Sequence, residues 1–538
     1  MTDAHKDQRT EPTRRAFVKA GAIAAPAIVA AGCVSTASAA GRSDGVVQTS
    51  NGPVKGIRDG GLHVFKGVRY GADTAITRFD KPRAPEPWSD VIQCTDYGKA
   101  SPQRGDRSQA EDCLFLNVWT PGLERDAKRP IMFYIHGGAY NSGSGSDELY
   151  DGRRLAEAGD VVVITVNHRL NAFGYLYLPL VMNGALPDSG NAGQWDLILA
   201  LKWVQANAVA FGGDPDRVMV FGQSGGGAKI ATMMASPAAK GLFHAAATMS
   251  GQQVTACGPL NGKARAMAFL DKVGVKPGDV DALKSMPVEK LIEGLSARDP
   301  INPEHGLYFG PVLDDRMLTR HPFWPDAPAQ SAKIPMILGN THDETRNLIG
   351  RREPDAFDMT WDELPAHIAH HMRCDILPET VVSTYRKAYP NYSAADVFFA
   401  ATTAGRSWRG QVEEADVRAR ENGPTWVYQF DWPSPDDGGK WGAPHTIDIA
   451  AAFGNLDKEG AFMGADANAR RVSDQLQHAF ISLARHGDPN HPGLPTWKKH
   501  RLPERATMVF DAETRLVDDP RKVERELFAK VPFTQWGT

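Results

Sequence analysis

The stretch that decides the fold is Val218-Met219-Val220-Phe221-Gly222-Gln223-Ser224-Gly225-Gly226-Gly227-Ala228-Lys229-Ile230. Four apolar residues typical of a buried strand run directly into a Gly-x-Ser-x-Gly turn, and a helix-like segment follows. So tight a turn needs small residues beside the serine, and its strained backbone lifts the hydroxyl clear of the sheet. A glycine-rich turn without a catalytic role is the alternative. The context favours a strand–turn–helix in which Ser224 is a nucleophile.

Further apolar runs without alternation surround this stretch and indicate strands buried on both faces. A segment with helical spacing, 197–208, lies between two of them, so strand and helix alternate as in a parallel sheet flanked by helices. Short β-like runs near the N-terminus suggest an antiparallel meander. The expected buried strands are 131–135, 161–166, 218–221 and 334–338, and the meander runs are 46–48, 54–56 and 63–65. The predicted fold class is α/β.

The composition is that of an ordinary globular protein. The 538 residues are 42% hydrophobic, and 60 basic against 64 acidic side chains give a net charge of −4. This excludes a disordered chain and gives no broad basic field for nucleic acid. We see no repeat or linker beyond residue 41. We therefore expect one domain over 41–538, with helical cap segments at roughly 255–330 and 345–425.

The first 40 residues resemble an export signal of the twin-arginine (Tat) type. Arg14-Arg15 precede a mildly apolar run and then Ala37-Ser38-Ala39, a small-x-small cleavage pattern. The apolar run is too short for a stable membrane span. We expect the protein to be exported, periplasmic or secreted, and to begin near residue 40. A weak lipobox at Cys33 leaves lipid anchoring as an alternative.

The cysteines suggest a bridge, because an exported protein enters an oxidising compartment. Cys94 and Cys113 enclose eighteen residues rich in Gly, Ser, Arg and Asp, so we expect a surface loop closed by a disulfide. Cys257 and Cys374 are distant in sequence and either pair or remain small buried side chains.

An acyl-transfer site also needs donors for the oxyanion that forms when a serine attacks a carbonyl. Ile135-His136-Gly137-Gly138-Ala139-Tyr140 follows an expected strand and has the form of an HGG-type oxyanion loop. The expected donors are the backbone N–H groups of Gly138, Ala139 and Gly225. We expect His136 to order the loop rather than to react.

These motifs and several others together resemble the type-B carboxylesterases, the cholinesterase-like branch of the α/β-hydrolases. The resemblance extends over the mature chain and is carried by Glu111–Trp119, Gly190–Gly193, Phe211–Pro215, Gly487–Asn490 and Leu494–Trp497. It implies an α/β-hydrolase fold and hydrolysis of small-molecule esters without a cofactor.

The family order of Ser, then Glu, then His implies the remaining catalytic residues. The segment Gly339–Glu344 makes Glu344 the orienting carboxylate, and Gly442–Ile449 makes His445 the base. A carboxylate selects the imidazole tautomer that leaves the other nitrogen free to accept the serine proton. Asp343 and Asp448 are competitors for the acid.

Three departures from the family pattern limit the expected substrates. Gln223 stands where many relatives have Glu, Gly225 replaces the usual Ala, and the 94–113 loop has no Trp for a cationic group. We expect a site for neutral esters. Amide or carbamate hydrolysis by the same triad is the alternative; a non-catalytic adhesion protein would lack the triad.

A metal hydrolase is disfavoured. His370 and His371, the candidate pair considered, are adjacent in sequence and do not share a helix face. The sequence gives no indication of the oligomeric state.

Overall fold

The strand that leads to Ser224 lies near the middle of an eleven-stranded sheet with the order β14-β13-β12-β11-β10-β9-β7-β8-β6-β4-β3. This computed structural model describes residues 45–105, 108–372, 374–535 and 537–538. Neighbouring strands from β8 to β13 are parallel, and the pairs at both ends of the sheet are antiparallel. The strands are β1 (Val46–Gln48), β2 (Pro53–Lys55), β3 (Ile57–Asp59), β4 (Leu62–Arg69), β5 (Ile92–Gln93), β6 (Phe115–Thr120), β7 (Arg129–Ile135), β8 (Val162–Val166), β9 (Gly213–Gln223), β10 (Ala245–Met249), β11 (Met336–Thr341), β12 (Thr425–Phe430), β13 (Ala506–Phe510) and β14 (Arg515–Asp518).

The central strands are apolar throughout because both of their faces are covered. In β7, Phe133 packs into one core and its neighbour Tyr134 into another. In β9, Val220 and Phe221 divide in the same way. Since successive side chains of a strand point to opposite faces, an unbroken apolar run is the sequence signature of this arrangement.

The helices fall into two layers and two peripheral groups. Residues of α3, α4 and α12 pack into the first core, and those of α1, α13 and α14 into the second. The helices are α1 (Arg153–Gly159), α2 (Asn171–Tyr175), α3 (Ala192–Asn207), α4 (Gly225–Ala235), α5 (Pro259–Val273), α6 (Val280–Ser285), α7 (Val288–Gly294), α8 (Glu344–Leu348), α9 (Leu364–His371), α10 (Pro378–Ala388), α11 (Ala394–Thr403), α12 (Arg409–Arg420), α13 (Ile447–Phe453), α14 (Ala467–His486) and α15 (Lys522–Phe528).

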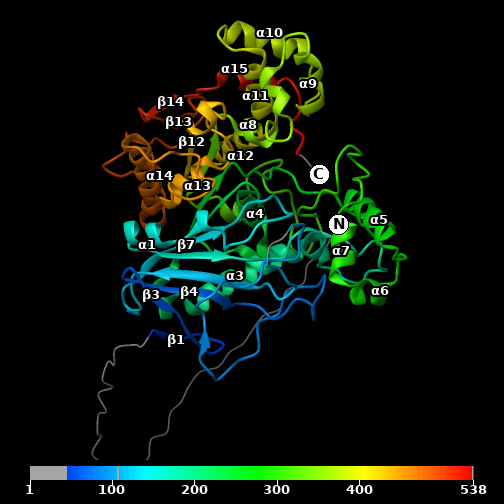
Figure 1. The fold of residues 1–538 in the computed structure, drawn as a ribbon, viewed down its shortest axis with the longest axis vertical. Helices are drawn as coiled ribbons and strands as arrows, with labels where there is room; N and C mark the ends of the chain where they lie inside the picture. The colour runs from blue at the N-terminus through cyan, green and yellow to red at the C-terminus, as the bar shows by residue number, and fades with distance from the viewer. Residues whose placement is uncertain (1–44, 106–107, 373, 536) are drawn as a thin grey trace, which may run out of the picture. The chain divides into compact units, whose positions relative to one another are not determined.

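The peripheral helices lie within the residue ranges of the expected cap segments, except α15 near the C-terminus. In Figure 1, α5, α6 and α7 lie together beside the sheet, while α9, α10, α11 and α15 form a second group. A π-helix, η7 (Ala404–Trp408), joins α11 to α12. Within the described residues, no helix has both the length and the apolar composition needed to cross a membrane. The expected signal segment and Cys33 lie outside the described residues.

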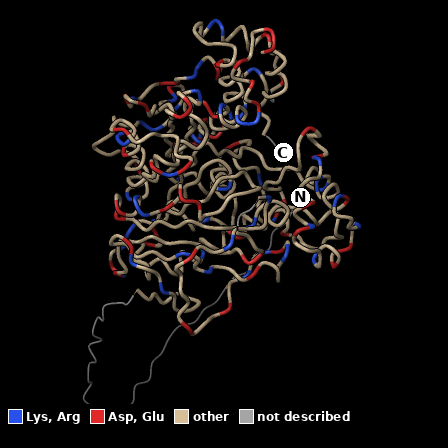
Figure 2. The backbone as a smooth tube through the Cα atoms, viewed as in Figure 1, with Lys and Arg blue, Asp and Glu red and all other residues tan. Residues whose placement is uncertain are grey.

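The N-terminal strands differ from a single meander. β1 and β2 form an antiparallel pair, but with β5 they make a separate three-stranded sheet. β4 instead pairs with β3 and β6 at the edge of the large sheet. Along the chain, acidic and basic side chains are interspersed, as Figure 2 shows.

The expectation of a disulfide between Cys94 and Cys113 is corrected by the structure, in which both residues are buried free thiols. The backbone of Lys66 donates to the carbonyl of Cys94 at 2.8 Å, whereas that of Tyr70 donates to Leu114 at 3.1 Å. Lys66 lies within a register shift between Phe65 and Val68, and Tyr70 lies beyond it. The two ends of the loop are thus bound to different parts of this segment, and their thiols are not joined.

Candidate active site

Ser224 occupies the sharp turn between β9 and α4. Its φ of 54° and ψ of −123° are strained for a residue with a side chain. A Cβ atom at Gly222 would lie 2.7 Å from the carbonyl oxygen of Ile135, and one at Gly226 would overlap that oxygen. Glycine at both positions is what allows β7 to pass this close to the turn.

The loop after β7 brings backbone donors to the same place. Gly138 and Ala139 both have positive φ, 88° and 52°, and both line a cavity with Ser224 and Gly225. In the part of the chain that the structure describes, the N–H groups of Gly138 and Ala139 have no hydrogen-bond acceptor. Gly225 is the first residue of α4, where backbone N–H groups lack intrahelical partners. His136 is buried beside this loop, with Nδ1 2.8 Å from the carbonyl of Gly137.

A buried lysine binds the backbone of the loop that follows β7. Nζ of Lys229 donates to the carbonyl of Ala139 at 2.6 Å and to that of Gly225 at 3.2 Å, and it lies 4.8 Å from the centre of the Tyr140 ring. A Cβ atom at Gly225 would overlap the Ala139 oxygen, so glycine is needed for this contact. Burial lowers the pKa of Lys229 to about 7. Gly225 leaves room for the carbonyl of Ala139, and Lys229 donates a hydrogen bond to that carbonyl, so both residues hold the loop in place.

Glu344 and His445 meet at the carboxyl end of the sheet. Oε2 of Glu344, the first residue of α8, makes a short hydrogen bond with Nδ1 of His445. Its other oxygen accepts from Asn340 and from the backbone of Thr341, each at 3.0 Å. Burial raises the pKa of Glu344, but attraction and hydrogen bonding from His445 outweigh it, so the pKa is lowered. The carboxylate is therefore ionised and bound to one nitrogen of the ring.

Asn347 fixes the backbone of His445 from the next turn of α8. Its amide donates to the His445 carbonyl at 2.7 Å and accepts from the His445 N–H at 3.2 Å. This pair of bonds holds both ends of the residue, so the ring is presented from a fixed backbone.

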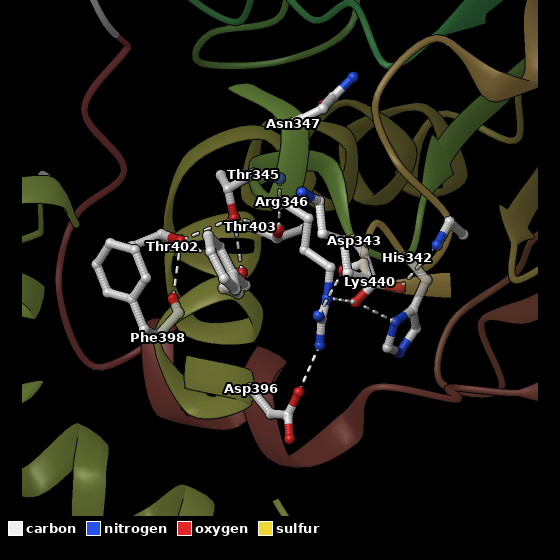
Figure 3. A network of polar contacts seen from close by, with 12 residues as sticks. His342, Asp343, Thr345, Arg346, Asn347, Asp396, Phe398, Thr402, Thr403 and Lys440 are labelled. Atoms are coloured by element: carbon white, nitrogen blue, oxygen red, sulfur yellow. Dashed lines mark hydrogen bonds and ion pairs between the residues drawn. The ribbon is translucent and has the colours of Figure 1, made fainter. Parts of the chain in front are cut away.

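Asp343 is bound elsewhere. Its carboxylate accepts from the backbone of Ala443 at 3.0 Å and lies 3.2 Å from His342 and 3.5 Å from Arg346. Figure 3 shows this network, in which Arg346 also reaches Asp396. Burial raises the pKa of Asp343, but His342 and Arg346 outweigh it and hold the pKa well below its usual range. Asp343 thus braces the loop that carries the histidine.

Asp448, the other competitor, is buried and accepts a hydrogen bond from Tyr428 at 2.7 Å. Burial raises the pKa of Asp448 to about 7. No hydrogen bond joins it to His445 in the described residues, which leaves Glu344 as the carboxylate on the ring.

Gln223 lies against the imidazole of His445. Its amide nitrogen is 3.1 Å from Nε2 and 3.4 Å from Nδ1 of that ring. Because an amide carries no charge, it does not favour the imidazolium as a carboxylate there would.

The cavity that contains Ser224 and His445 has a volume of about 620 Å³. The loop after β7 and the start of α4 form one part of its lining. Another part comes from the cap segment, with Leu348, Arg352 and the π-helix residues Gly405, Arg406 and Ser407. Two arginines thus line the cavity, which the expectation of a site for neutral esters did not include.

One group of metal-binding side chains lies away from this cavity. Within the described residues, the ligand atoms of Glu353, His367 and His371 lie within 4.8 Å of one another. His367 and His371 are four residues apart on α9 and share a face, a spacing that the sequence analysis overlooked beside His370. None of the three lines the cavity, so we assign the group no part in the reaction.

Comparison with known proteins agrees with this geometry. The family model described as the Carboxylesterase family matches residues 43–529. The chain belongs to the carboxylesterase family. It is 34% identical to the para-nitrobenzyl esterase of Bacillus subtilis over 89% of this chain and 98% of that protein. It is 31% identical to the phenmedipham hydrolase of Pseudarthrobacter oxydans over 87% and 95%.

A solved structure of a relative has the same fold. The carboxylesterase EST55 of Geobacillus stearothermophilus superposes with a TM-score of 0.80 and 33% identity, covering 90% of this chain and all of that one. The protein is accordingly a carboxylic ester hydrolase with an α/β-hydrolase fold.

Part of the lining of this carboxylesterase cavity was expected from the sequence, namely the turn at Ser224, the loop at Gly138 and Ala139, and His445. The sequence analysis did not find Lys229, Asn347 or the two arginines. Gly225 was identified as a departure from the family pattern. The signal that could have identified Lys229 is its position as a charged residue in an otherwise apolar helix.

Proposed function

We propose that the protein hydrolyses carboxylic esters through a Ser224–His445–Glu344 triad and an acyl-enzyme intermediate. The observation that carries this proposal is the bond between Glu344 and Nδ1 of His445, at the edge of the cavity that also contains Ser224 and free backbone donors. With Nδ1–H donated to the carboxylate, Nε2 is the nitrogen that accepts a proton.

In the proposed reaction, Ser224 Oγ attacks the ester carbonyl carbon while its proton passes to Nε2 of His445. The carbonyl oxygen becomes an oxyanion, held by the N–H groups of Gly138, Ala139 and Gly225. Collapse breaks the bond to the alkoxy group, which takes the proton from His445 and leaves. Water then repeats the sequence on the acyl-enzyme and releases the acid.

Replacing Ser224 tests the mechanism. We expect Ser224→Ala to lower kcat for a neutral nitrophenyl ester at least about a thousandfold, because the attacking oxygen is removed. A fluorophosphonate or sulfonyl fluoride should label Ser224 stoichiometrically in the native protein and not in the variant. Hydrolysis by a folded Ser224→Ala protein at the native rate would refute the proposal. A matched amide and carbamate, assayed in parallel, determine whether the activity extends beyond esters.

The acid is tested by two neighbouring substitutions. Glu344→Gln should lower kcat by roughly 10³ to 10⁴, because the ring loses the partner that fixes its tautomer. Asp343→Asn should act mainly on stability, since Asp343 holds the loop at Ala443. If the folded Asp343 variant is the inactive one, Glu344 is not the acid.

We also propose export by the twin-arginine route, on the basis of Arg14-Arg15 and the cleavage pattern that ends at Ala39. Replacing both arginines by lysine should leave the precursor inside the cell. A periplasmic mature chain that starts near residue 40 supports the proposal, whereas a lipidated N-terminal Cys33 would replace it with a membrane anchor.

A further inference from the structure

The charges that face the catalytic cavity are unbalanced. Arg352 and Arg406 line it, and no described Asp or Glu is among the lining residues. The charged triad member Glu344 lies behind His445 and is bonded to it. The cavity therefore presents two guanidinium groups to whatever enters.

Within the described residues, the side chains of Arg352 and Arg406 form no hydrogen bond or ion pair, and the carboxylate that acts electrostatically on Arg406 is that of Glu344. Two buried arginines elsewhere are each paired with a carboxylate, Arg169 with Asp196 at 2.7 Å and Arg265 with Asp299 at 2.7 Å. The Arg406 guanidinium lies in a partly desolvated wall without such an ion pair, and an anion that enters the cavity would supply one.

Arg406 is the more enclosed of the two, and Arg352 is exposed at the rim. Burial lowers the pKa of Arg406 and the charge of Arg352 lowers it further, while the attraction of Glu344 opposes both without outweighing them. Two like charges held together favour a negatively charged ligand between them.

The position of Arg406 is tied to the catalytic carboxylate. It lies on the π-helix η7, a rare local geometry that often occurs at functional sites. The amide of Asn340 donates at 3.0 Å to Glu344 and at 3.0 Å to Ser407, the residue after Arg406. One side chain thus holds both the triad acid and the segment that carries the arginine.

We propose that Arg352 and Arg406 form an anion subsite, and that the preferred substrates are esters carrying a carboxylate. Arginine fits this task because its planar guanidinium donates two parallel hydrogen bonds to a carboxylate. The inference rests on the proposed esterase function and adds its substrate class. The carboxylate can belong to the acyl part, as in a monoester of a dicarboxylic acid, or to the alcohol part.

Matched substrates separate these cases. The acyl arm compares 4-nitrophenyl hydrogen glutarate with 4-nitrophenyl butyrate, and the alcohol arm compares 4-acetoxybenzoate with phenyl acetate. The measured quantity is the ratio of kcat/KM for the charged ester to that for its neutral partner. We expect this ratio to fall about tenfold in Arg406→Met in at least one arm, the scale of one charge-assisted hydrogen bond. Arg406→Lys keeps the positive charge, so its ratio should lie between those of the wild type and Arg406→Met.

Arg351→Met is the matched control. Arg351 precedes Arg352 but contacts the rings of Trp441 and Phe462 and does not line the cavity. Its removal should leave the ratio unchanged, whereas Arg352→Met should lower it. Free glutarate should inhibit the wild type competitively, with a weaker Ki in the Arg406→Met variant and at high salt.

An unchanged ratio in both arms for folded Arg352→Met and Arg406→Met proteins would overturn the anion subsite. That outcome is distinguishable from failure of the esterase mechanism, which is judged by Ser224→Ala on the neutral esters alone. A fall in the acyl arm places the carboxylate on the acid, and a fall in the alcohol arm places it on the leaving group.

Discussion

The cavity lining has two parts, one formed mainly by backbone atoms and the other mainly by side chains. Around Ser224 the wall is backbone, with the glycines of the turn and the loop at Gly138 and Ala139 in direct contact. At the cap segment the wall is made by side chains of Leu348, Arg352 and Arg406. The backbone part has almost no room for added atoms, whereas the side chains of the cap part can change without moving the main chain.

This contrast indicates how the two parts contribute. Backbone donors are fixed before the substrate arrives, which is the arrangement that stabilises a developing oxyanion. Side chains from distant segments are, in the anion subsite that we propose, the groups that select the substrate. We therefore expect substitutions in the backbone part to act on kcat, and those in the cap part to act on the choice between substrates.

Among substitutions in the backbone part, we expect Gly225→Ala, which adds one methyl group, to lower kcat the most. In Gly225→Ala the new Cβ would overlap the carbonyl oxygen of Ala139, so the loop must shift and its donors move with it. We expect kcat to fall about a hundredfold, the scale of losing one oxyanion donor, with a smaller change in KM. Steady-state kinetics on a neutral nitrophenyl ester measures this.

Gly258→Ala is the control, because a Cβ atom there meets nothing within 4 Å. If Gly225→Ala retains the native kcat while folded, the loop adapts freely and the backbone part is less rigid than the structure indicates.

Lys229 should have the next largest effect. Lys229→Met keeps the length of the side chain but removes the bonds to the carbonyls of Ala139 and Gly225. We expect kcat to fall about tenfold and the melting temperature to fall modestly, because two buried carbonyl groups lose their donor. Arginine at this position should restore part of kcat if charge is what matters. A loss of stability with unchanged kcat would show that Lys229 is only structural.

Lys229 should also make stability depend on pH. Burial lowers its pKa to about 7 in the folded protein, against about 10.4 in an unfolded chain. Between these values the unfolded chain holds a proton that the folded protein lacks, so the free energy of unfolding rises with pH in this window. The rise should be smaller in Lys229→Met, as denaturant titrations at pH 7 and pH 9 would show. An equal rise in both proteins would mean that Lys229 keeps an ordinary pKa.

The same contrast explains what the sequence could predict. The turn at Ser224 and the loop at Gly138 depend on short runs of small residues next to apolar strands, so local patterns indicate both. Glu344 and His445 are 101 residues apart, and only resemblance to a family selected them. Lys229, Asn347 and Arg406 depend on which distant atoms the fold brings near them, and no local pattern describes that.

The smallest expected effect concerns the two cysteines, where sequence spacing was misleading. Eighteen residues between Cys94 and Cys113 suggested a closed loop, but the structure has both thiols free. A bridge of that length would stabilise the protein by about 3 kcal/mol. Because both thiols are free and buried, we expect a reductant to leave the melting temperature unchanged.

Alkylation gives an independent measurement of the same thiols. Burial raises the pKa of Cys94 to about 11 and that of Cys113 higher still, so neither is a reactive thiolate in the native protein. Iodoacetamide should label both only after unfolding, without any reductant. A linked Cys94–Cys113 peptide in the native protein, together with a lower melting temperature on reduction, would contradict the free thiols and restore the bridge expected from the sequence.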